Sequence, residues 1–317
     1  MTDDTVAPPP PRPKKRDVHG WLILDKPVGM TSTHAVAIVK RVYRAKKAGH
    51  AGTLDPLASG CLPIALGEAT KTVPYVMDGE KAYRFTVSWG VETTTDDTEG
   101  APTRSSDKRP DRAEIEALLP KFTGTILQVP PQFSAIKVDG ERAYDLARDG
   151  EIVKLEAREV VIERLAIVSH TPEATVIEAE CGKGTYVRAI ARDLGRALGC
   201  YGHVIALRRT RVGPFMESIF VSADELIRDI ADPIEREAHL VSLNSPVERG
   251  LDDLPSVTVS MADAARLRRG QSVILRGRDA PILEGHITVF CGSDLVAIGD
   301  VRGAELRPHR VFTFGSP

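Results

Sequence analysis

A single carboxylate, Asp55, lies in the segment HAGTLDPLASG, which spans residues 50 to 60. The turn formers Gly52, Pro56 and Gly60 flank it and predict a short loop that restricts the carboxylate and keeps it near the surface. A carboxylate restricted in this way could act as a nucleophile or as a general base. It could also be an ordinary turn or cap residue. The lack of an obvious second carboxylate argues against glycoside hydrolysis.

Three arginines, Arg188, Arg192 and Arg196, lie four residues apart in the segment that begins GKGTYVRAIARDLG. This spacing places them on one side of a predicted helix that ends near Gly199, with apolar residues on the other side. They could bind phosphates, or Arg188 could pair with a buried carboxylate, although solvated arginines are the simplest interpretation. The Gly-Lys-Gly turn before the helix does not match the phosphate-loop pattern, so nucleotide hydrolysis is not expected.

Two aromatic rings, those of His50 and Tyr83, lie near the ends of predicted sheet elements. An RNA base could stack on either ring in such a place. A role in the core or on the surface is the alternative for each.

Charge is unevenly distributed along the chain, although the net charge of the 317 residues is only −2. Residues 26–54 carry six Lys or Arg and no acid, and residues 181–214 carry seven against Asp193. Residues 223–253 carry nine acids against three Arg. This segregation favours a positive face that could hold a polyanion, with unrelated solvated helix faces as the alternative.

Several other classes of function are not favoured. The four cysteines form no CxxC pair, the eight histidines form no HExxH motif, and no apolar run approaches the length of a membrane span. We therefore expect reduced thiols in a cytoplasmic protein, with no metal site and no contact with a membrane.

The elements that must position these residues indicate an α+β fold. The segments WLIL and YRFTVSWG predict strands, and a helix capped by Thr31 or Ser32 follows the first of them. Two further strand patterns, REVVIERLAIVSH and ATVIEAECGKG, precede the arginine-bearing helix. Residues 19–252 should therefore form a mixed, mainly antiparallel sheet with helices, with an excursion at about residues 124–152.

The two ends of the chain differ from this body. Residues 1–18 are Pro-rich, polar and aperiodic, so we expect a disordered tail. After the acidic region, where the pattern is weak, short strand patterns recur towards the end of the chain. Residues 253–317 therefore predict a small, separate β-rich domain.

Taken together, these segments resemble the TruB family, the bacterial pseudouridine synthases of tRNA. GWLILDKPVGMTS is similar to the opening motif of the family, and GHAGTLDPLASGCLPIALGEATK to its catalytic motif, with Asp55 at the nucleophile position. KAYRF carries the active-site tyrosine, Tyr83, and CGKGTYVRAIARDLGRALG carries the arginine partner, Arg188. PPQFSAIKVDGERAYDLAR is similar to the RNA-clasping insertion, and the C-terminal segment to a PUA-type module. The sequence departs from the family pattern at Thr94, where relatives often carry Asp.

The resemblance implies an isomerase that acts on the T stem-loop of tRNA, at the uridine of tRNA position 55. Such an enzyme breaks the N1–C1′ bond of uridine, turns the base and joins C5 to C1′, without a cofactor or a metal. Asp55 would attack the ribose or assist proton loss there, once the base has been flipped out of the RNA. The basic surroundings would hold phosphates and favour the charged carboxylate. Tyr83 would stack on the flipped base, and its hydroxyl is a candidate for removing the C5 proton.

Further roles follow from the same resemblance. His50 would fill the gap that the flipped base leaves in the RNA. Substrate contacts are assigned to Lys26, His50, Gly52, Thr53, Leu54, Asp97, Lys137, Tyr186 and Leu207. The implied protein is a cytoplasmic monomer with no obligatory protein partner and a PUA-like RNA-binding domain at residues 253–317. Two rivals remain: a protein that only binds or folds tRNA would use the same basic face, and a carboxylate hydrolase would release free uracil.

Overall fold

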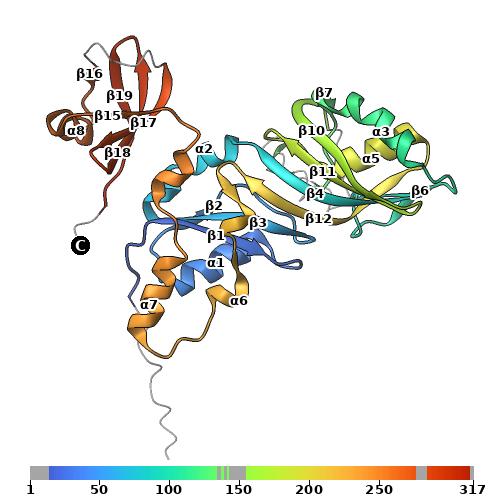
Figure 1. The fold of residues 1–317 in the computed structure, drawn as a ribbon, viewed down its shortest axis with the longest axis horizontal. Coiled ribbons are helices and arrows are strands. Elements are labelled where there is room, and N and C mark those ends of the chain that lie inside the picture. Colours follow the sequence, from blue (N-terminus) through green and yellow to red (C-terminus); the bar gives the residue numbers. More distant parts are fainter. Residues whose placement is uncertain (1–13, 134–136, 139–140, 143–154, 276–283, 315–317) are drawn as a thin grey trace, which may run out of the picture.

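The computed structural model describes residues 14–133, 137–138, 141–142, 155–275 and 284–314. A ten-stranded sheet forms the body of this part of the chain (Figure 1). Its strands are β1 (Gly20–Lys26), β2 (Ala48–His50), β3 (Ala58–Leu66), β4 (Lys81–Trp89), β7 (Gly124–Gln128), β10 (Arg158–His170), β11 (Ala174–Cys181), β12 (Gly202–Val212), β13 (Phe215–Met216) and β14 (Val221–Ser222).

Eight of these strands follow the order β14-β1-β3-β12-β4-β11-β10-β7, while β2 adds to β3 and β13 adds to β12. The β1–β14 and β3–β12 pairs are parallel. The other pairs in this sheet are antiparallel. The expected mixed and mainly antiparallel sheet is therefore confirmed.

Helices and short 3-10 turns lie along the sheet. They are α1 (Ser32–Val42), η1 (Gly67–Lys71), α2 (Val73–Asp78), α3 (Arg112–Leu118), η2 (Leu119–Phe122), α5 (Val187–Leu198), η3 (Glu217–Ile219), α6 (Ala223–Leu226), α7 (Pro233–Ser242) and η4 (Val247–Leu251). The Thr31 side chain caps α1 by accepting a hydrogen bond from the His34 N–H at 3.1 Å. At the end of α5, Gly199 adopts a φ of 68°, a left-handed conformation that favours glycine and ends helices.

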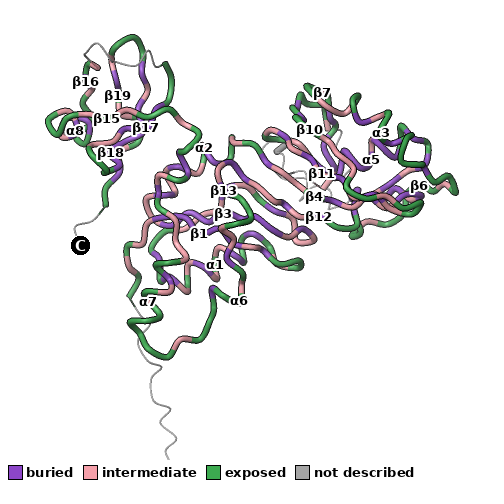
Figure 2. Tube along the Cα trace, in the orientation of Figure 1, coloured by how far each residue is buried: buried purple, intermediate pink, exposed green. Residues whose placement is uncertain are grey.

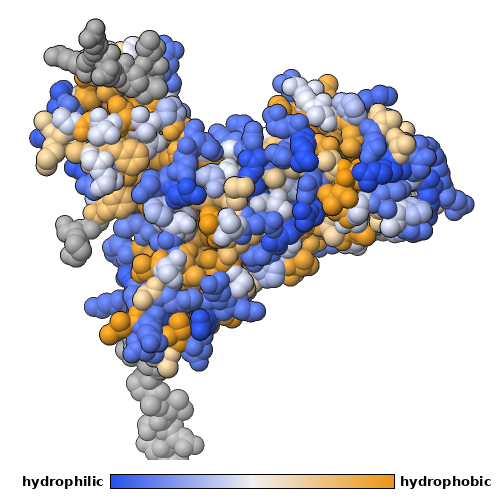
Figure 3. All heavy atoms as spheres, viewed as in Figure 1, coloured by the Kyte–Doolittle hydropathy of each residue, from blue (hydrophilic) through white to orange (hydrophobic). Residues whose placement is uncertain are grey.

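Side chains of the strands alternate between the two faces of the sheet, as strand geometry requires. On β1, Leu22 and Leu24 belong to a core that also receives the apolar sides of α1 and α5. Trp21 and Ile23 belong to a second core, on the opposite face of the sheet. Figure 2 shows the buried residues concentrated along the strands and exposed residues along the outer loops and helices. Figure 3 shows hydrophilic residues over much of the surface of the body, interrupted by hydrophobic ones.

The C-terminal part forms a separate curled sheet, as the sequence predicted (Figure 1). It consists of β15 (Ser256–Thr258), β16 (Val273–Ile274), β17 (Gly285–Cys291), β18 (Asp294–Arg302) and β19 (Glu305–Val311), with α8 (Met261–Arg268) packed on them. This domain has a core of its own, but Leu295, Ile298 and Phe312 also join the second core of the body beside Trp21. The domain is therefore packed against the body by apolar contacts.

Two segments hold more regular structure than expected. The segment after β4, for which no helix or strand was expected, contains a hairpin of β5 (Val91–Thr93) and β6 (Pro102–Ser105). The acidic region of weak pattern contains α6, α7 and η4. Asp232 caps α7 by accepting from the N–H groups of Ile234 and Glu235.

Residues 14–18 of the expected disordered tail are described, so the prediction of disorder is wrong for these residues. The Arg16 N–H donates to the Arg44 carbonyl at 2.9 Å, which attaches this segment to the turn after α1. Residues 1–13 and much of the expected insertion at 124–152 lie outside the described residues. None of the described helices is long and apolar enough to cross a membrane.

Candidate active site around Asp55

The segment between β2 and β3, here called the Asp55 loop (residues 51–57), is fixed on both sides of Asp55. The Ser32 hydroxyl, in the first turn of α1, accepts from the Leu54 N–H and donates to the Leu54 carbonyl, both at 2.9 Å. The Leu54 side chain is buried in the first core. On the other side, the Pro56 carbonyl accepts from the Gly29 N–H at 2.7 Å. The packing of α1 and of the turn after β1 therefore sets the position of Asp55.

A buried lysine, Lys26, holds the same turn from inside. Its ammonium donates to the carbonyls of Pro27 and Met30 at 2.9 and 2.8 Å, and to that of Pro56 at 3.4 Å. Burial lowers the pKa of Lys26 to about 8, although the nearby Asp55 charge acts in the opposite direction. Lys26 therefore joins the turn after β1 to the Asp55 loop.

A second buried cation, Arg209 in β12, holds the start of the loop. Its guanidinium donates to the carbonyls of Gly52, Thr53 and Cys61 at 3.1, 3.2 and 2.8 Å. Gly52 and Gly60 have φ values of 94° and 98°, a region that favours glycine. At Gly60 a Cβ atom would lie 2.2 Å from the Arg209 carbonyl oxygen. Gly60 therefore lets β3, directly after the Asp55 loop, approach the backbone of β12 closely.

Arg188, in the first turn of α5, links Asp55 to the interior. Its Nη2 lies 2.9 Å from Asp55 Oδ2 and also donates to the Phe133 carbonyl at 3.0 Å. Its Nη1 lies 3.1 Å from Asp97 Oδ2 and donates to the Thr95 carbonyl at 3.0 Å. The side chain of Asp97 is 1% exposed and that of Asp55 is 38% exposed. One guanidinium therefore bridges a buried carboxylate and a solvent-accessible one. Its positive charge compensates the negative charge of Asp55 from the interior side of the site.

Tyr83 and Leu207 lie on the strands beside the loop. In the pairing of β4 with β12, Arg209 is opposite Tyr83, and in the pairing of β12 with β3, Leu207 is opposite Ala58. Burial raises the pKa of Tyr83 to about 12 against the opposing charge of Arg209, so the phenol is neutral near pH 7. His50 ends β2, and burial together with the Arg209 charge lowers the pKa of His50, so its imidazole is neutral there too.

Tyr186, the residue before α5, is held through its backbone. The Gln128 side chain accepts from the Tyr186 N–H at 2.8 Å and donates to the Tyr186 carbonyl at 3.2 Å. Because Arg188 follows two residues later, this contact orients the start of α5 towards Asp55. Within the described residues, no three His, Cys, Asp or Glu side chains lie close enough together to hold a metal ion.

Comparison with known proteins accounts for this arrangement. Residues 40–187 match the family model described as TruB family pseudouridylate synthase (N terminal domain). Residues 188–252 match the one described as tRNA pseudouridylate synthase B C-terminal domain. The chain belongs to the TruB family of pseudouridine synthases.

Relatives named tRNA pseudouridine synthase B match nearly the whole of this TruB-family chain. That of Rhodopseudomonas palustris is 61% identical over 303 residues, which cover 95% of this chain and 83% of the relative. That of Rhizobium meliloti is 56% identical over 305 residues, which cover 96% and 98%. The protein is therefore an isomerase, a tRNA pseudouridine synthase.

Solved structures share the TruB-family fold described above. A crystal structure of a Cbf5-Nop10-Gar1 complex is 26% identical, with a TM-score of 0.75 over 93% of this chain and 85% of that chain. The structure of an H/ACA RNP bound to a substrate RNA containing 2′-deoxyuridine is 24% identical, with a TM-score of 0.73 and the same two coverages. Both likenesses support the arrangement of sheet and C-terminal domain.

Some of the residues expected from the TruB-family pattern lie together at Asp55, and others are buried away from solvent. Asp55 contacts Arg188, and the Asp55 charge contributes to the raised pKa of Tyr83, so the three lie within electrostatic reach. Lys26 and Asp97 are buried, so the substrate contacts expected of them do not fit this structure, and they hold the loop and the guanidinium instead. The side chain of Lys137, which lies in β8 (Lys137–Val138) and pairs with β9 (Glu141–Arg142), is outside the described part.

The arginines of α5 do not form the basic face that the sequence allowed. Arg192 is 6% exposed and pairs with Asp96 at 3.0 Å and with Asp193 at 2.8 Å. Arg196 donates to both carboxylate oxygens of Glu92, at 2.7 and 2.8 Å. These acids neutralise the two arginines, so the phosphate contact considered for Arg192 does not fit its position.

Sequence reasoning missed two residues that position the Asp55 loop, Ser32 and Arg209. The two-residue period of a strand places Arg209 on the same face as Leu207, and this was the available signal. Ser32 gave no comparable signal, because a serine at the start of a helix is first of all a capping candidate.

Proposed function

We propose that this enzyme converts the uridine at position 55, in the T loop of tRNA, to pseudouridine, with Asp55 as the catalytic carboxylate. The observation that carries the proposal is the accessible Asp55 carboxylate, held at 2.9 Å by the buried guanidinium of Arg188. The membership of the TruB family supports the reaction, and the likeness of the HAGTLDPLASG segment to the catalytic motif supports the role of Asp55.

The reaction begins when the uridine is flipped out of its loop, at a cost of a few kcal/mol. Asp55 then attacks C1′ of the ribose or takes a ribose proton, and either route breaks the N1–C1′ bond. The base turns and C5 bonds to C1′, which displaces the Asp55 carboxylate on the first route; on the second route Asp55 returns the ribose proton. C5 releases a proton and N1 gains one, so the product is an isomer of the substrate. Throughout this sequence the carboxylate stays in place, because Ser32, Arg209 and Arg188 hold its loop before substrate arrives.

The two neutral rings, Tyr83 on β4 and His50 at the end of β2, suit the two stacking roles. Tyr83 stacks on the flipped base, and His50 occupies the gap that the base leaves in the RNA. Because the raised pKa of Tyr83 keeps its phenol protonated, its oxygen can take the C5 proton only if the phenolic proton leaves in the same step. Leu207 would contact an apolar part of the flipped base, since it lies on β12, the strand next to that of Tyr83.

The test is to incubate the purified protein with a tRNA transcript and with an isolated T stem-loop, and then to map pseudouridine in both. We expect one modified site in each, at position 55. Asp55→Asn keeps the shape of the side chain and should retain RNA binding but form no product. The matched control is Asp229→Asn, which alters an exposed aspartate for which the described residues provide no ion-pair partner.

Three outcomes would overturn the proposal. An Asp55→Asn variant with a tenth or more of the wild-type single-turnover rate would exclude a catalytic carboxylate at this position. Unmodified RNA after tight binding would favour a protein that only binds tRNA. Release of free uracil would favour a hydrolase.

A further inference from the structure

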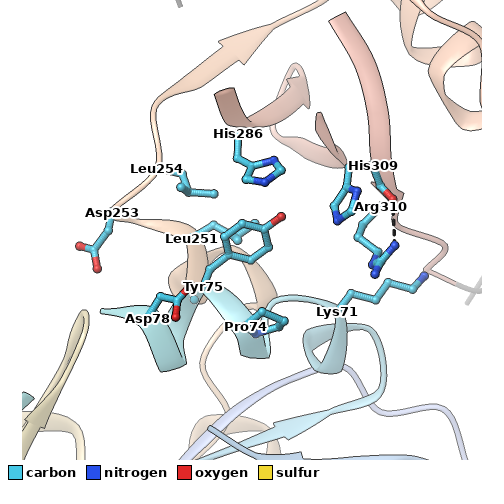
Figure 4. A pocket seen from close by; sticks show the side chains of 11 residues that line it. Lys71, Pro74, Tyr75, Asp78, Leu251, Asp253, Leu254, His286, His309 and Arg310 are labelled. Carbon is cyan, nitrogen blue, oxygen red and sulfur yellow. Dashed lines mark hydrogen bonds between the residues drawn. The ribbon is translucent and has the colours of Figure 1, made fainter. Parts of the chain in front are cut away.

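A pocket of about 410 Å³ lies between the body and the C-terminal domain, and none of its lining residues belongs to the Asp55 loop (Figure 4). The body contributes Tyr75 from α2 and Leu251 from the end of η4. The C-terminal domain contributes His286 from β17, and His309 and Arg310 from β19. Two separately folded parts of the chain therefore build this pocket.

Three rings line one wall of the pocket. The ring centroids of Tyr75 and His286 are 5.7 Å apart at an interplanar angle of 86°, and those of His286 and His309 are 5.3 Å apart at 37°. Within the described residues, no hydrogen bond is made by the Tyr75 hydroxyl or by the two imidazoles, although each can donate or accept. The wall therefore offers both flat apolar faces and unused polar atoms.

The two ends of the pocket carry opposite charge. Figure 4 shows Arg310 and Lys71 on one side of Tyr75, and Asp78 and Asp253 on the other. Lys71 is already paired, with Glu68 at 2.5 Å and with the Val311 carbonyl at 2.8 Å.

In contrast, the Arg310 guanidinium donates to the carbonyl of His309 at 3.2 Å and has no acid partner in the described part of the chain. Asp253 likewise has no ion-pair partner among the described residues. The unpaired charges are therefore a cation at one end and a carboxylate at the other.

We propose that this pocket holds one unpaired nucleotide of the RNA substrate, outside the loop that reaches Asp55. The rings of Tyr75 and His309 would stack on the base, and Arg310 would bind the phosphate. Asp253 would accept a hydrogen bond from the ribose or from an amino group of the base. A simple anion would leave the rings unused, whereas a nucleotide uses both the rings and the cation, and the volume suits a small ligand.

The inference rests on the proposed function only for the identity of the ligand as RNA. Its test compares binding of the full-length protein to three probes: a tRNA transcript, the isolated T stem-loop and a single-stranded RNA hexamer. The variants are Tyr75→Ala, His309→Ala and Arg310→Ala. The matched control is Arg302→Ala, which removes an exposed arginine of the same sheet that pairs with Asp300 outside the pocket.

Loss of a stacking ring costs about 1–3 kcal/mol per base, so Tyr75→Ala and His309→Ala should weaken binding of the hexamer and of tRNA roughly 5- to 150-fold. Arg310→Ala should lower the slope of log affinity against log salt by about 0.7, as expected for one phosphate of a single strand. Arg302→Ala should leave that slope unchanged. Affinity for the isolated T stem-loop, and its conversion rate at saturation, should stay at the wild-type level in all four variants.

Wild-type affinity for the hexamer and for tRNA in the His309→Ala and Arg310→Ala variants would overturn the inference. Both side chains are exposed, so their removal should leave the fold intact, and urea unfolding of the two variants checks this. If the variants bound the isolated T stem-loop as weakly as they bind tRNA, the inference would also be overturned. The substitutions would then act on the catalytic domain and not on the binding of a separate nucleotide. If the wild-type protein bound the hexamer through these residues but failed to modify the stem-loop, the pocket would stand and the proposed function would fall.

Discussion

Replacing Arg188 by Met, a side chain of similar length without charge, separates the two carboxylates that the guanidinium now bridges. Asp97, on the Nη1 side, is 1% exposed, and Asp55, on the Nη2 side, is 38% exposed. The Arg188→Met variant therefore leaves one carboxylate buried without its cation and the other accessible without its partner. Leaving Asp97 without its cation should lower the free energy of unfolding, and leaving Asp55 without its partner should lower the reaction rate.

The magnitudes of the two losses differ. Removing one partner of a buried ion pair costs about 3–5 kcal/mol, a large part of the 5–15 kcal/mol that is roughly typical for unfolding. A hydrogen bond to a charged group contributes about 1.5–3 kcal/mol, which corresponds to roughly ten- to a hundredfold in rate. Because water can partly replace Arg188 at the accessible Asp55, we expect the rate to fall by about tenfold, the lower end of that range.

The double variant Arg188→Met/Asp97→Asn distinguishes the two effects. The amide oxygen introduced at position 97 would still accept from the Glu99 N–H, as Asp97 Oδ1 now does at 3.0 Å, but the side chain would no longer bury a charge. Urea unfolding should show that the double variant regains most of the stability that the single variant loses. The single-turnover rate on saturating T stem-loop should remain about tenfold low in both. If the double variant recovered the rate as well, Arg188 would serve only the fold, and its contact with Asp55 would have no part in the chemistry.

Three further predictions concern the surroundings of Asp55. Lys47 is exposed, lies three residues before His50 and has no acid partner in the described residues. Lys47→Ala should therefore lower the slope of log tRNA affinity against log salt by about 0.7–0.9. Arg192→Met should leave that slope unchanged. A lowered slope for Arg192→Met with an unchanged one for Lys47→Ala would contradict the assignment of Arg192 to the interior. A second comparison is between the free energies of unfolding of the wild type and of Lys26→Met. The difference, wild type minus variant, should rise between pH 8 and 10.5. In that window Lys26 is protonated in the unfolded chain but has released its proton in the folded one. If urea unfolding gave the same difference between wild type and Lys26→Met at every pH in that window, Lys26 would not be desolvated. Tyr83→Phe should keep RNA affinity within about twofold and Tyr83→Leu should lose about 1–3 kcal/mol, as expected for a stacking ring. Wild-type release of the C5 proton by the Phe variant would exclude the hydroxyl as its acceptor.

The parts of the fold that the sequence predicts are those in which one face of an element is buried. Strand β1 and helix α5 show this clearly, because their apolar residues repeat with the periods of a strand and of a helix. Helix α7 was not recognised because Leu240 is its single buried residue, in a stretch of acids. What holds it is tertiary: the Tyr43 hydroxyl donates to the Leu240 carbonyl at 2.8 Å, across 197 residues of sequence. No local pattern can report a contact of that kind.

The same limit decides what could be known of the site. Arginines four residues apart give the same sequence pattern whether they face water or a row of acidic side chains, here called the ladder. In this structure the ladder comes from the loop and hairpin after β4, more than 90 residues earlier in the chain: Glu92 meets Arg196, Asp96 meets Arg192 and Asp97 meets Arg188.

The ladder has two consequences for function. First, it removes Arg188 and Arg192 from the charge available to RNA, so near Asp55 the exposed cations of the basic stretch at residues 26–54, such as Lys47, are the candidates for phosphate binding. Second, it fixes α5 to the rest of the body immediately behind Asp55. A guanidinium that is held by Asp97 and by two backbone carbonyls cannot follow a moving carboxylate, so Asp55 is positioned against a rigid partner before the RNA binds.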